Sequence, residues 1–382
     1  MTSHNPFVYG EVVPVAAFAD RVDELDRLVA DLANAQKVFL VSPRRYGKSS
    51  LIRRALAALE RRGAITLDVT VASYSSYLAF LEGFARAVAA AQTPWDRARA
   101  WLREALGSVR SEIRVEPNVG GPQLAVAFPE ARTSRDVERL APDVFALPGR
   151  LATARGRNVV VALDEFQAIG GFDGGSVEQA LRAAIQHQRR VGYVFAGSEP
   201  TLMERMLGPK RPFYKAGPVL RLGRIPSEEF AAFVEVRFAK SGIRPDEHVG
   251  AAIVELAGNM PYDVQRLAHE AWDDVRAARG RRITQEDLHR TLHRLLAQQA
   301  PVFEQLWQRL TLVQRAALRA VVLTEGRGLL SADVRARYRL GGTSTVQAAL
   351  AALTRDDVIA REQDRYTVND SLLREWVARK TF

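Results

Sequence analysis

The sequence predicts an α/β protein with a parallel sheet in its first 225 residues and helices after them. Short apolar runs alternate with helical patterns up to residue 222, which is the order expected when helices connect parallel strands. The run at 159–163 is apolar at every position, as is typical of a strand buried on both faces of a sheet. After Pro226 the strand signals stop, and apolar residues recur at helical spacing.

The elements of the first part are expected in a regular order. Each strand is a short apolar run, and each helix has apolar residues three or four positions apart. We expect strands at 38–41, 65–71, 159–163, 193–196 and 219–222, and helices at 19–33, 133–155 and 176–190. A further helix contains Leu51 to Leu59 and is ended by Gly63, and residues 74–110 are expected to be helical with breaks near Pro94 and Gly107. Apolar residues alternate with polar ones on both sides of a glycine pair within 111–130, which predicts a hairpin inserted in this domain.

The second part is expected to contain two domains. Residues 227–298 have the pattern of several helices, with Pro261 near a helix start and Pro301 near a boundary. The last eighty residues indicate three helices and then short strands at 358–361 and 365–368, which is the order of a winged helix. The expected domains are a core at 1–225, a helical domain at 226–299 and a winged helix at 300–382.

The composition excludes several classes of protein. The 382 residues are 47% hydrophobic and 26% charged, which excludes collagen-like, mucin-like and wholly disordered chains. Cysteine is absent, so disulfide scaffolds, thiolate zinc sites and cysteine nucleophiles are excluded. No signal peptide or membrane span is visible, and we expect a cytoplasmic protein without a membrane partner. The net charge of +10 favours a polyanionic partner, although an arginine-rich proteome explains it equally well.

The most informative motif lies between the first strand and the helix after it. It reads Ser-Pro-Arg-Arg-Tyr-Gly-Lys-Ser, which matches a phosphate-binding loop except that serine replaces the first glycine. Loop and helix N-terminal N–H groups are expected to bind phosphate. Gly47 leaves room for it, Lys48 supplies positive charge, and Ser49 is expected to ligate Mg²⁺. The expected nucleotide-binding residues are Ser42, Pro43, Arg44, Arg45, Tyr46, Gly47, Lys48, Ser49 and Ser50. The alternative is a plain turn with a surface lysine.

Two adjacent carboxylates end the strand at 159–163, where α/β sheets place their ligands. Asp164 is expected to hold Mg²⁺ through water, and Glu165 to orient or deprotonate an attacking water. Neighbouring residues of an extended chain point to opposite sides, which suits separate roles. Ser198 follows the next strand and could hydrogen-bond the γ-phosphate or the water, although capping the following helix is an equally good interpretation. Gln167 is a further candidate for this network.

Six segments occur in an order that resembles one known family. They lie at 18–25, 42–51, 163–167, 196–198, 212–214 and 258–262. Together they resemble the archaeal-type P-loop ATPases, which belong to the signal-transduction ATPases with numerous domains within the AAA+ class. The resemblance covers residues 6–280. It implies a five-stranded parallel core with a helical lid, which binds ATP or ADP with Mg²⁺ and hydrolyses ATP.

The resemblance also implies roles for particular residues. Lys48, Glu165 and Ser198 would take part in catalysis, and the segment 18–25, which contains Arg21, would lie near the adenine. Pro261 in the lid motif would approach the nucleotide; related origin-recognition ATPases have an arginine there, so we assign no lid arginine. Arg211 is the best candidate for an arginine finger, a role that requires a homo-oligomer.

The C-terminal domain resembles the winged helices that often end members of this family. Residues 305–382 contain 13 basic and 8 acidic side chains, which favours nucleic acid. The helix at 343–354 carries hydroxyl and amide side chains but no arginine or lysine, so few base-specific contacts are expected. The expected phosphate contacts are Arg335, Arg337, Arg339, Arg361 and Arg365. A winged helix that packs against a protein partner is the alternative.

Two functions from different classes are consistent with these motifs. The first is an ATP-hydrolysing molecular switch whose lid movement changes what the winged helix contacts, DNA or a protein partner. The second is a regulatory or scaffold module that holds ATP or ADP with negligible turnover. A P-loop kinase ranks third, because the sequence has no acceptor-site signature.

Overall fold

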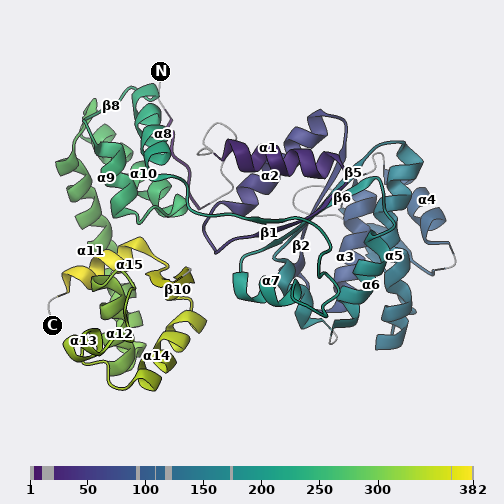
Figure 1. The fold of residues 1–382 in the computed structure, drawn as a ribbon. Helices are drawn as coiled ribbons and strands as arrows, with labels where there is room; N and C mark the ends of the chain where they lie inside the picture. Colours follow the sequence, from purple (N-terminus) through teal and green to yellow (C-terminus); the bar gives the residue numbers. More distant parts are fainter. Residues whose placement is uncertain are drawn as a thin grey trace. The chain divides into compact units, whose positions relative to one another are not determined.

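The structure is a computed structural model that describes residues 4–10, 21–91, 95–107, 109–116, 123–172, 175–362 and 364–380 (Figure 1). These residues form two compact units. The core unit extends from Arg21 to Gly223, and the helical unit contains residues 224–380 together with residues 4–10. No helix among the described residues is long and apolar enough to span a membrane.

A five-stranded parallel sheet forms the centre of the core unit, as expected. Its strands are β1 (Lys37–Val41), β2 (Ile65–Thr70), β5 (Val159–Asp164), β6 (Val191–Gly197) and β7 (Val219–Arg221). Their order across the sheet is β2-β5-β6-β1-β7, with every pair parallel. The strands β5 and β6 are buried almost throughout, which explains why they read as continuous apolar runs. This arrangement confirms the fold class and places the ends of β1, β5 and β6 at one edge.

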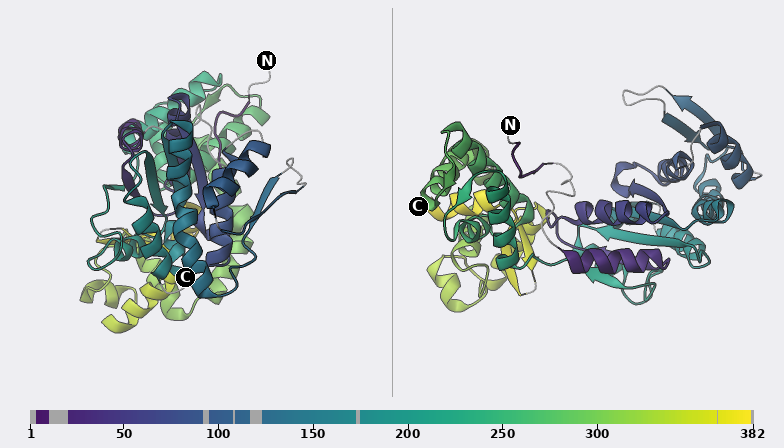
Figure 2. Two further views of the ribbon diagram at one scale, coloured as in Figure 1. Left: turned by 90° about the vertical axis from the view of Figure 1, so that its right-hand side faces the viewer. Right: turned by 90° about the horizontal axis from the view of Figure 1, so that it is seen from above.

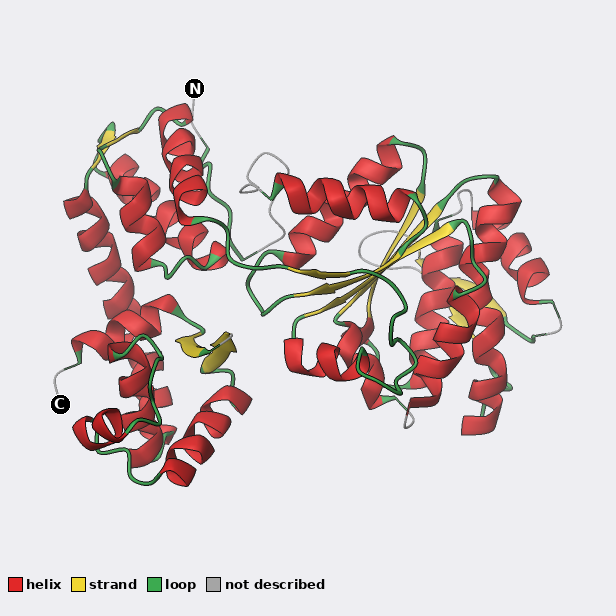
Figure 3. Cartoon of the chain, viewed as in Figure 1, coloured by secondary structure: helices red, strands yellow, loops and turns green. Residues whose placement is uncertain are grey.

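Helices cover both faces of this sheet (Figures 1 and 3). The helices α1 and α2 lie on one face, and α3, α5, α6 and α7 lie on the other, as right-handed crossovers require. Their bounds are α1 (Val22–Ala33), α2 (Lys48–Arg61), α3 (Tyr77–Ala90), α5 (Ser134–Arg155), α6 (Ser176–Ile185) and α7 (Pro200–Met206). Aromatic rings fill the core, and the Phe195 ring centroid lies 4.9 Å from that of Phe39 and 4.7 Å from that of Phe166.

The expected hairpin insertion is present. Strands β3 (Glu112–Glu116) and β4 (Gln123–Ala127) pair antiparallel, and the turn between them lies outside the described residues. The hairpin follows helix α4 (Trp95–Leu106), and its β4 strand packs against α3 (Figure 2). Ile113 and Val126 are buried in the main core, so the insertion is an integral part of the unit.

The helical unit begins with α8 (Ser227–Lys240), α9 (Val249–Leu256) and α10 (Pro261–Ala277). Two strands that the sequence did not predict, β8 (Arg244–Pro245) after α8 and β9 (Arg282–Ile283) after α10, pair parallel. Each has only two residues, too few to show an alternating pattern. The backbone N–H groups of Arg244 and Asp246, on either side of Pro245, donate the hydrogen bonds of this pairing. The N–H that proline lacks therefore removes no hydrogen bond between the two strands.

One long helix joins the two domains that we expected to divide near residue 300. Helix α11 (Gln285–Arg309) contains Pro301 in its interior, so no break in secondary structure marks the expected boundary. The winged helix follows with α12 (Leu312–Leu323), α13 (Ala332–Arg337), α14 (Thr343–Arg355), β10 (Ile359–Glu362), β11 (Arg365–Val368) and α15 (Ser371–Arg379). One hydrophobic core extends through all of these helices.

The N-terminal strap, residues 4–10, belongs to the helical unit, although we expected residues 1–225 to form the core. Phe7 is buried against Phe238, with ring centroids 4.6 Å apart. The Asn5 amide donates to the His269 carbonyl at 3.0 Å, and the Tyr9 hydroxyl donates to a Glu270 carboxylate oxygen at 2.8 Å. These partners are more than 230 positions away, beyond the reach of local sequence patterns.

Candidate nucleotide site

The loop between β1 and α2 accommodates the serine that replaces the usual glycine. The Ser42 side chain is buried, its N–H donates to the Gly197 carbonyl at 3.2 Å, and its hydroxyl donates to the Pro43 carbonyl at 3.1 Å. The turn needs left-handed backbone at Arg45 (φ 68°) and Gly47 (φ 83°). A Cβ at Gly47 would meet no protein atom within 4 Å, so within the protein it is the left-handed backbone, and not close packing, that favours glycine.

The N-terminus of α2 has the character of an anion site. A helix leaves its first N–H groups without partners inside the helix, and its dipole favours negative charge there. No side chain caps α2, and its first turn contains no acidic residue. The first turn instead carries Lys48, Ser49 and Ser50. This end of α2 therefore fits a phosphate group, as the motif predicted.

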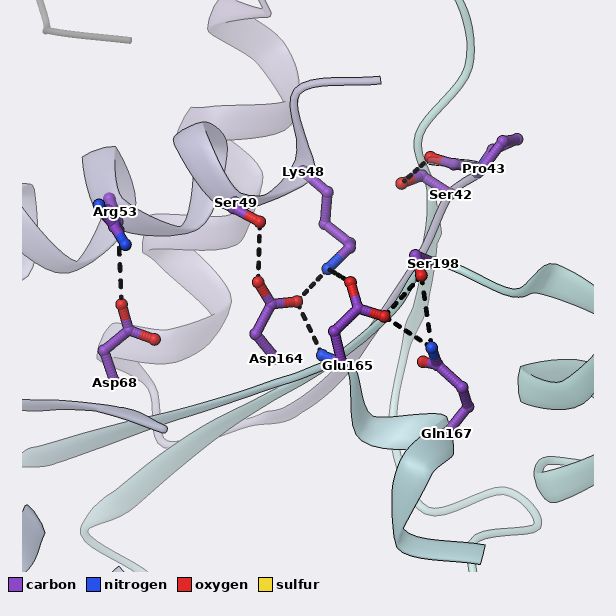
Figure 4. Close-up of polar contacts among 10 residues, drawn as sticks. All are labelled: Ser42, Pro43, Lys48, Ser49, Arg53, Asp68, Asp164, Glu165, Gln167 and Ser198. Atoms are coloured by element: carbon purple, nitrogen blue, oxygen red, sulfur yellow. Dashed lines mark hydrogen bonds and ion pairs between the residues drawn. The ribbon is translucent and has the colours of Figure 1, made fainter. Parts of the chain in front are cut away.

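The motif residues meet the first carboxylate of β5 (Figure 4). The Ser49 hydroxyl donates to Oδ2 of Asp164 at 2.8 Å, and the buried Lys48 ammonium pairs with Oδ1 of the same carboxylate. A hydroxyl and a carboxylate are hard oxygen donors, the type that Mg²⁺ prefers together with water and phosphate oxygens. The described residues contain no cluster of three or more His, Cys, Asp or Glu side chains suited to a metal.

The second carboxylate, Glu165, has partners just after β6 and on the 3-10 helix that follows β5. The Ser198 hydroxyl donates to Oε2 of Glu165 at 2.5 Å, and the Gln167 amide donates to the same oxygen at 2.6 Å. Oε1 of Glu165 lies 3.5 Å from the Lys48 ammonium. Both carboxylates therefore reach Lys48, which differs from the opposite orientations expected on an extended strand. The cause is the left-handed backbone of Glu165 (φ 53°) at the start of the 3-10 helix η3 (Phe166–Gly171).

The position of Ser198 distinguishes its two interpretations. The N-cap of α7 is Glu199, and no side chain caps that helix. The Ser198 side chain is buried and directed to Glu165, so it belongs to the polar network and not to the helix cap.

Arg21 stabilises the loop by hydrogen bonds to backbone carbonyl groups. Its buried guanidinium donates to the Tyr46 carbonyl at 3.1 Å and to the Gly223 carbonyl at 2.7 Å, and it pairs with Glu24 at 3.1 Å. Burial lowers the pKa of Arg21, and Glu24 acts against this shift. Residues 18–20 of the expected adenine segment lie outside the described residues. The structure thus gives Arg21 a contact with the phosphate loop that the sequence analysis missed.

Asp68 is a second residue that the sequence analysis missed. It lies on β2 in register with Ala162, and Oδ2 of Asp68 is 3.6 Å from Nε of Arg53 on α2. Burial raises the pKa of Asp68, Arg53 lowers it, and the nearby Asp164 raises it further. A charged residue within the apolar strand expected at 65–71 was the signal that could have identified it.

The remaining expected site residues lie elsewhere. Pro261 is the first residue of α10 in the helical unit. Arg44 is exposed and lies 4.0 Å from the Glu199 carboxylate. Arg211 pairs at 2.9 Å with Glu178, whose side chain is only 1% exposed and whose pKa is raised by burial. The candidate arginine finger is therefore bound to a carboxylate of its own chain.

The winged helix presents a mixed surface. The hydroxyl residues Thr343 and Ser344 at the start of α14 are exposed, as is Arg361 on β10. Arg365 pairs with Glu362 of the same hairpin at 3.8 Å. Arg335 donates to the Leu330 carbonyl at 3.1 Å and Arg337 lies over the Tyr338 ring, whereas Arg339 is exposed. The five arginines expected to contact phosphate are therefore not equally free to do so.

Comparisons with known proteins agree with this fold. A family model described as "Probable winged helix domain" matches residues 301–379. None of the curated proteins matches the chain. A Walker-type ATPase from Pyrococcus abyssi is similar in structure, with a TM-score of 0.63 and 17% identity over 98% of this chain and 99% of that one.

Two origin-recognition proteins from Aeropyrum pernix are also similar. Orc2, solved as ADPNP–ADP complexes, has a TM-score of 0.53 and 15% identity over 99% of this chain and 97% of its own. Orc1, solved in complex with DNA, has a TM-score of 0.51 and 16% identity over 94% and 92%. The chain therefore has the fold of a P-loop ATPase of the AAA+ type that ends in a winged helix, and the resemblance inferred from the motifs is confirmed at this level.

Proposed function

We propose that this protein is a P-loop ATPase that binds ATP with Mg²⁺ and hydrolyses it to ADP and phosphate. The observation that supports this most directly is the meeting of Lys48, Ser49 and Asp164 at the uncapped N-terminus of α2, with Glu165 beside them. A positive charge, two hard oxygen donors and a carboxylate base are the groups that phosphoryl transfer to water needs.

Each residue has a distinct part in this reaction. The loop backbone from Ser42 to Ser50 and the Lys48 ammonium would hold the β- and γ-phosphates. Ser49 and Asp164 would hold Mg²⁺, which when bound neutralises charge on the phosphate oxygens. Glu165 would take a proton from water as the water oxygen bonds to the γ-phosphorus and the bond to ADP breaks. Ser198 would orient Glu165 from the next strand.

We further propose that the winged helix carries the output of the switch. Helix α11 and a shared hydrophobic core join it to the lid helices, so any movement of the lid would move the winged helix with it. The basic excess after residue 305 favours DNA phosphates as its target, and the similar Orc1 structure contains DNA. A protein partner of the winged helix is the alternative.

A second function is favoured by one observation. Arg211 is paired with a buried carboxylate of its own chain, so its use as a finger toward a neighbouring copy in a homo-oligomer would require that pair to break. A chain that keeps this pair would hold ATP or ADP as a regulatory module with negligible turnover. Hydrolysis that rises steeply with protein concentration would support the oligomer and contradict this alternative.

Phosphate release by the full-length protein tests the proposed activity. We expect ATP hydrolysis that depends on Mg²⁺, loss of ATP binding in Lys48→Ala, and retained binding without turnover in Glu165→Gln. Lys240→Ala, which changes an exposed lysine of α8, is the matched control and should behave as wild type. Wild-type hydrolysis in both site variants would refute the assignment of the site.

A gel shift with duplex DNA tests the proposed output. A complex held by phosphate contacts should weaken steeply between about 50 and 200 mM salt. Arg339→Ala and Arg361→Ala should weaken it on every sequence tested, because both side chains are exposed. If no shift occurs at low salt, with or without ATP, the winged helix has a protein partner instead.

A further inference from the structure

The Gln167 side chain extends from η3 toward the second carboxylate (Figure 4). Its amide nitrogen donates to Oε2 of Glu165 at 2.6 Å and to the Ser198 hydroxyl oxygen at 3.3 Å. The Ser198 hydroxyl donates to the same Glu165 oxygen at 2.5 Å. The three side chains thus form a closed triangle, and only Oε1 of Glu165 is directed toward Lys48.

We propose that Gln167 is a positioning residue for the hydrolysis of ATP, which acts by fixing the carboxylate of Glu165. This inference rests on the proposed function. With Oε2 held by two donors, the carboxylate cannot rotate, and Oε1 is the oxygen left to accept a proton from water. Gln167 itself would contact neither ATP nor the attacking water.

The orientation of the amide supports this role. Oε1 of Gln167 is buried and makes no hydrogen bond with any described residue. A buried hydrogen-bond acceptor without a partner destabilises the folded protein. The hydrogen bonds that the Gln167 amide N–H groups donate must therefore stabilise this orientation by more than the unpaired oxygen destabilises it. The reversed amide would place two oxygens against each other beside Glu165, which is unfavourable. The Glu165 carboxylate and the Gln167 amide therefore fix each other's orientation.

The packing around the amide leaves it little freedom. A Cβ at Gly197 would lie 2.3 Å from the Met203 Cγ and 3.0 Å from the Gln167 Oε1. The absence of a side chain at Gly197 is therefore what allows Gln167 and Met203 to approach β6. The flanking Phe166 is fully buried, which anchors η3 against the sheet.

Gln167→Met removes both hydrogen bonds at nearly constant volume, which makes it a suitable test variant. General-base catalysis contributes about 10²- to 10⁴-fold, and misplacing a catalytic group by about 1 Å can cost about 10²-fold. We therefore expect kcat to fall by about 10- to 100-fold, while KM and the Kd of a fluorescent ATP analogue stay unchanged. Gln186→Met, which alters an exposed glutamine of the same unit, is the control and should have wild-type kcat.

A double-mutant cycle distinguishes positioning from a structural effect. In a Glu165→Gln background, where only slow residual hydrolysis of bound ATP is followed in a single turnover, Gln167→Met should cause no further loss of that residual rate, because the group on which it acts is already gone. An equal loss in both backgrounds would mean that Gln167 acts independently of Glu165, and would overturn the proposal. Wild-type kcat in Gln167→Met would overturn it too, with the ATPase assignment intact. If the wild-type chain itself hydrolyses no ATP, the proposed function fails and this inference fails with it.

Discussion

The ion pair between Arg224 and Glu362 provides the most quantitative test of how the wing is held. Arg224 is the first residue of the helical unit after the core, and Glu362 ends the wing strand β10. Three nitrogen–oxygen pairs join them at 3.0–3.2 Å, and Arg224 also donates to the Gly258 carbonyl. The perturbation is Glu362→Gln, which removes the charge and keeps the shape.

The expected magnitude follows from geometry and burial. The two side chains are 24% and 16% exposed, between a surface pair and a buried one. Exposed pairs contribute about 0–1 kcal/mol, and hydrogen bonds to charged groups about 1.5–3 kcal/mol. For a bidentate pair at this depth we expect a coupling energy of about 1.5 kcal/mol, or roughly a tenfold change in an equilibrium constant.

Hydrogen exchange of the amides that join β10 to β11 measures this coupling locally. We expect exchange about tenfold faster in Glu362→Gln and in Arg224→Gln, with no further acceleration in the double variant. Arg355→Gln is the control, because Arg355 is 76% exposed and pairs only with its neighbour Asp356 among the ion pairs described. Effects of the single variants that add to within about 0.5 kcal/mol would refute the reasoning.

Three further outcomes are expected. Gly192→Ala should lower the urea midpoint by the equivalent of about 1–3 kcal/mol, because its Cβ would lie 2.6 Å from the Leu32 carbonyl oxygen; an unchanged midpoint would contradict this. Burial and the hydrogen bond to Glu270 raise the pKa of Tyr9 to about 12, so the stability that Tyr9 contributes is complete below pH 10, its ordinary pKa, and is lost as pH rises toward 12. The difference in free energy of unfolding between wild type and Tyr9→Phe, measured in urea, should therefore shrink from pH 9 to 11.5. A constant difference would disprove the raised pKa of Tyr9. Arg21→Met should weaken ATP binding about tenfold, because it leaves two backbone carbonyls unpaired. Titration with a fluorescent ATP analogue measures this, and wild-type affinity would count against a role of Arg21 in holding the phosphate-binding loop.

The sheet and the phosphate loop could be predicted because their signals are local. The strand β5 is apolar from Val159 to Leu163, where both of its faces are buried, and the carboxylates of Asp164 and Glu165 at its end fall at the ligand-binding edge. The motif at 42–49 likewise specifies a strand, a turn and a helix within one stretch of chain. The order of the strands and the meeting of Ser49 with Asp164 could be expected only because such folds place these ends together.

The features that sequence analysis missed depend on distant contacts or on backbone conformation. The position of the N-terminal strap is set by α8 and α10, and no pattern near Phe7 reveals these partners. The left-handed conformation of Glu165 cannot be read from a carboxylate that follows an apolar run. Pro301 suggested a helix end, because proline lacks an N–H, but packing of the surrounding residues in the helical unit keeps α11 continuous.

The N-terminal strap has a consequence for the synthesis of the protein. The core unit is one uninterrupted stretch and can fold as soon as it has left the ribosome. The strap is made before the core, yet its partners on α8 and α10 are made only after the whole core. Phe7 therefore lacks its ring partner Phe238 until the core has been made, and a nascent chain stalled before residue 227 should offer this apolar segment to chaperones.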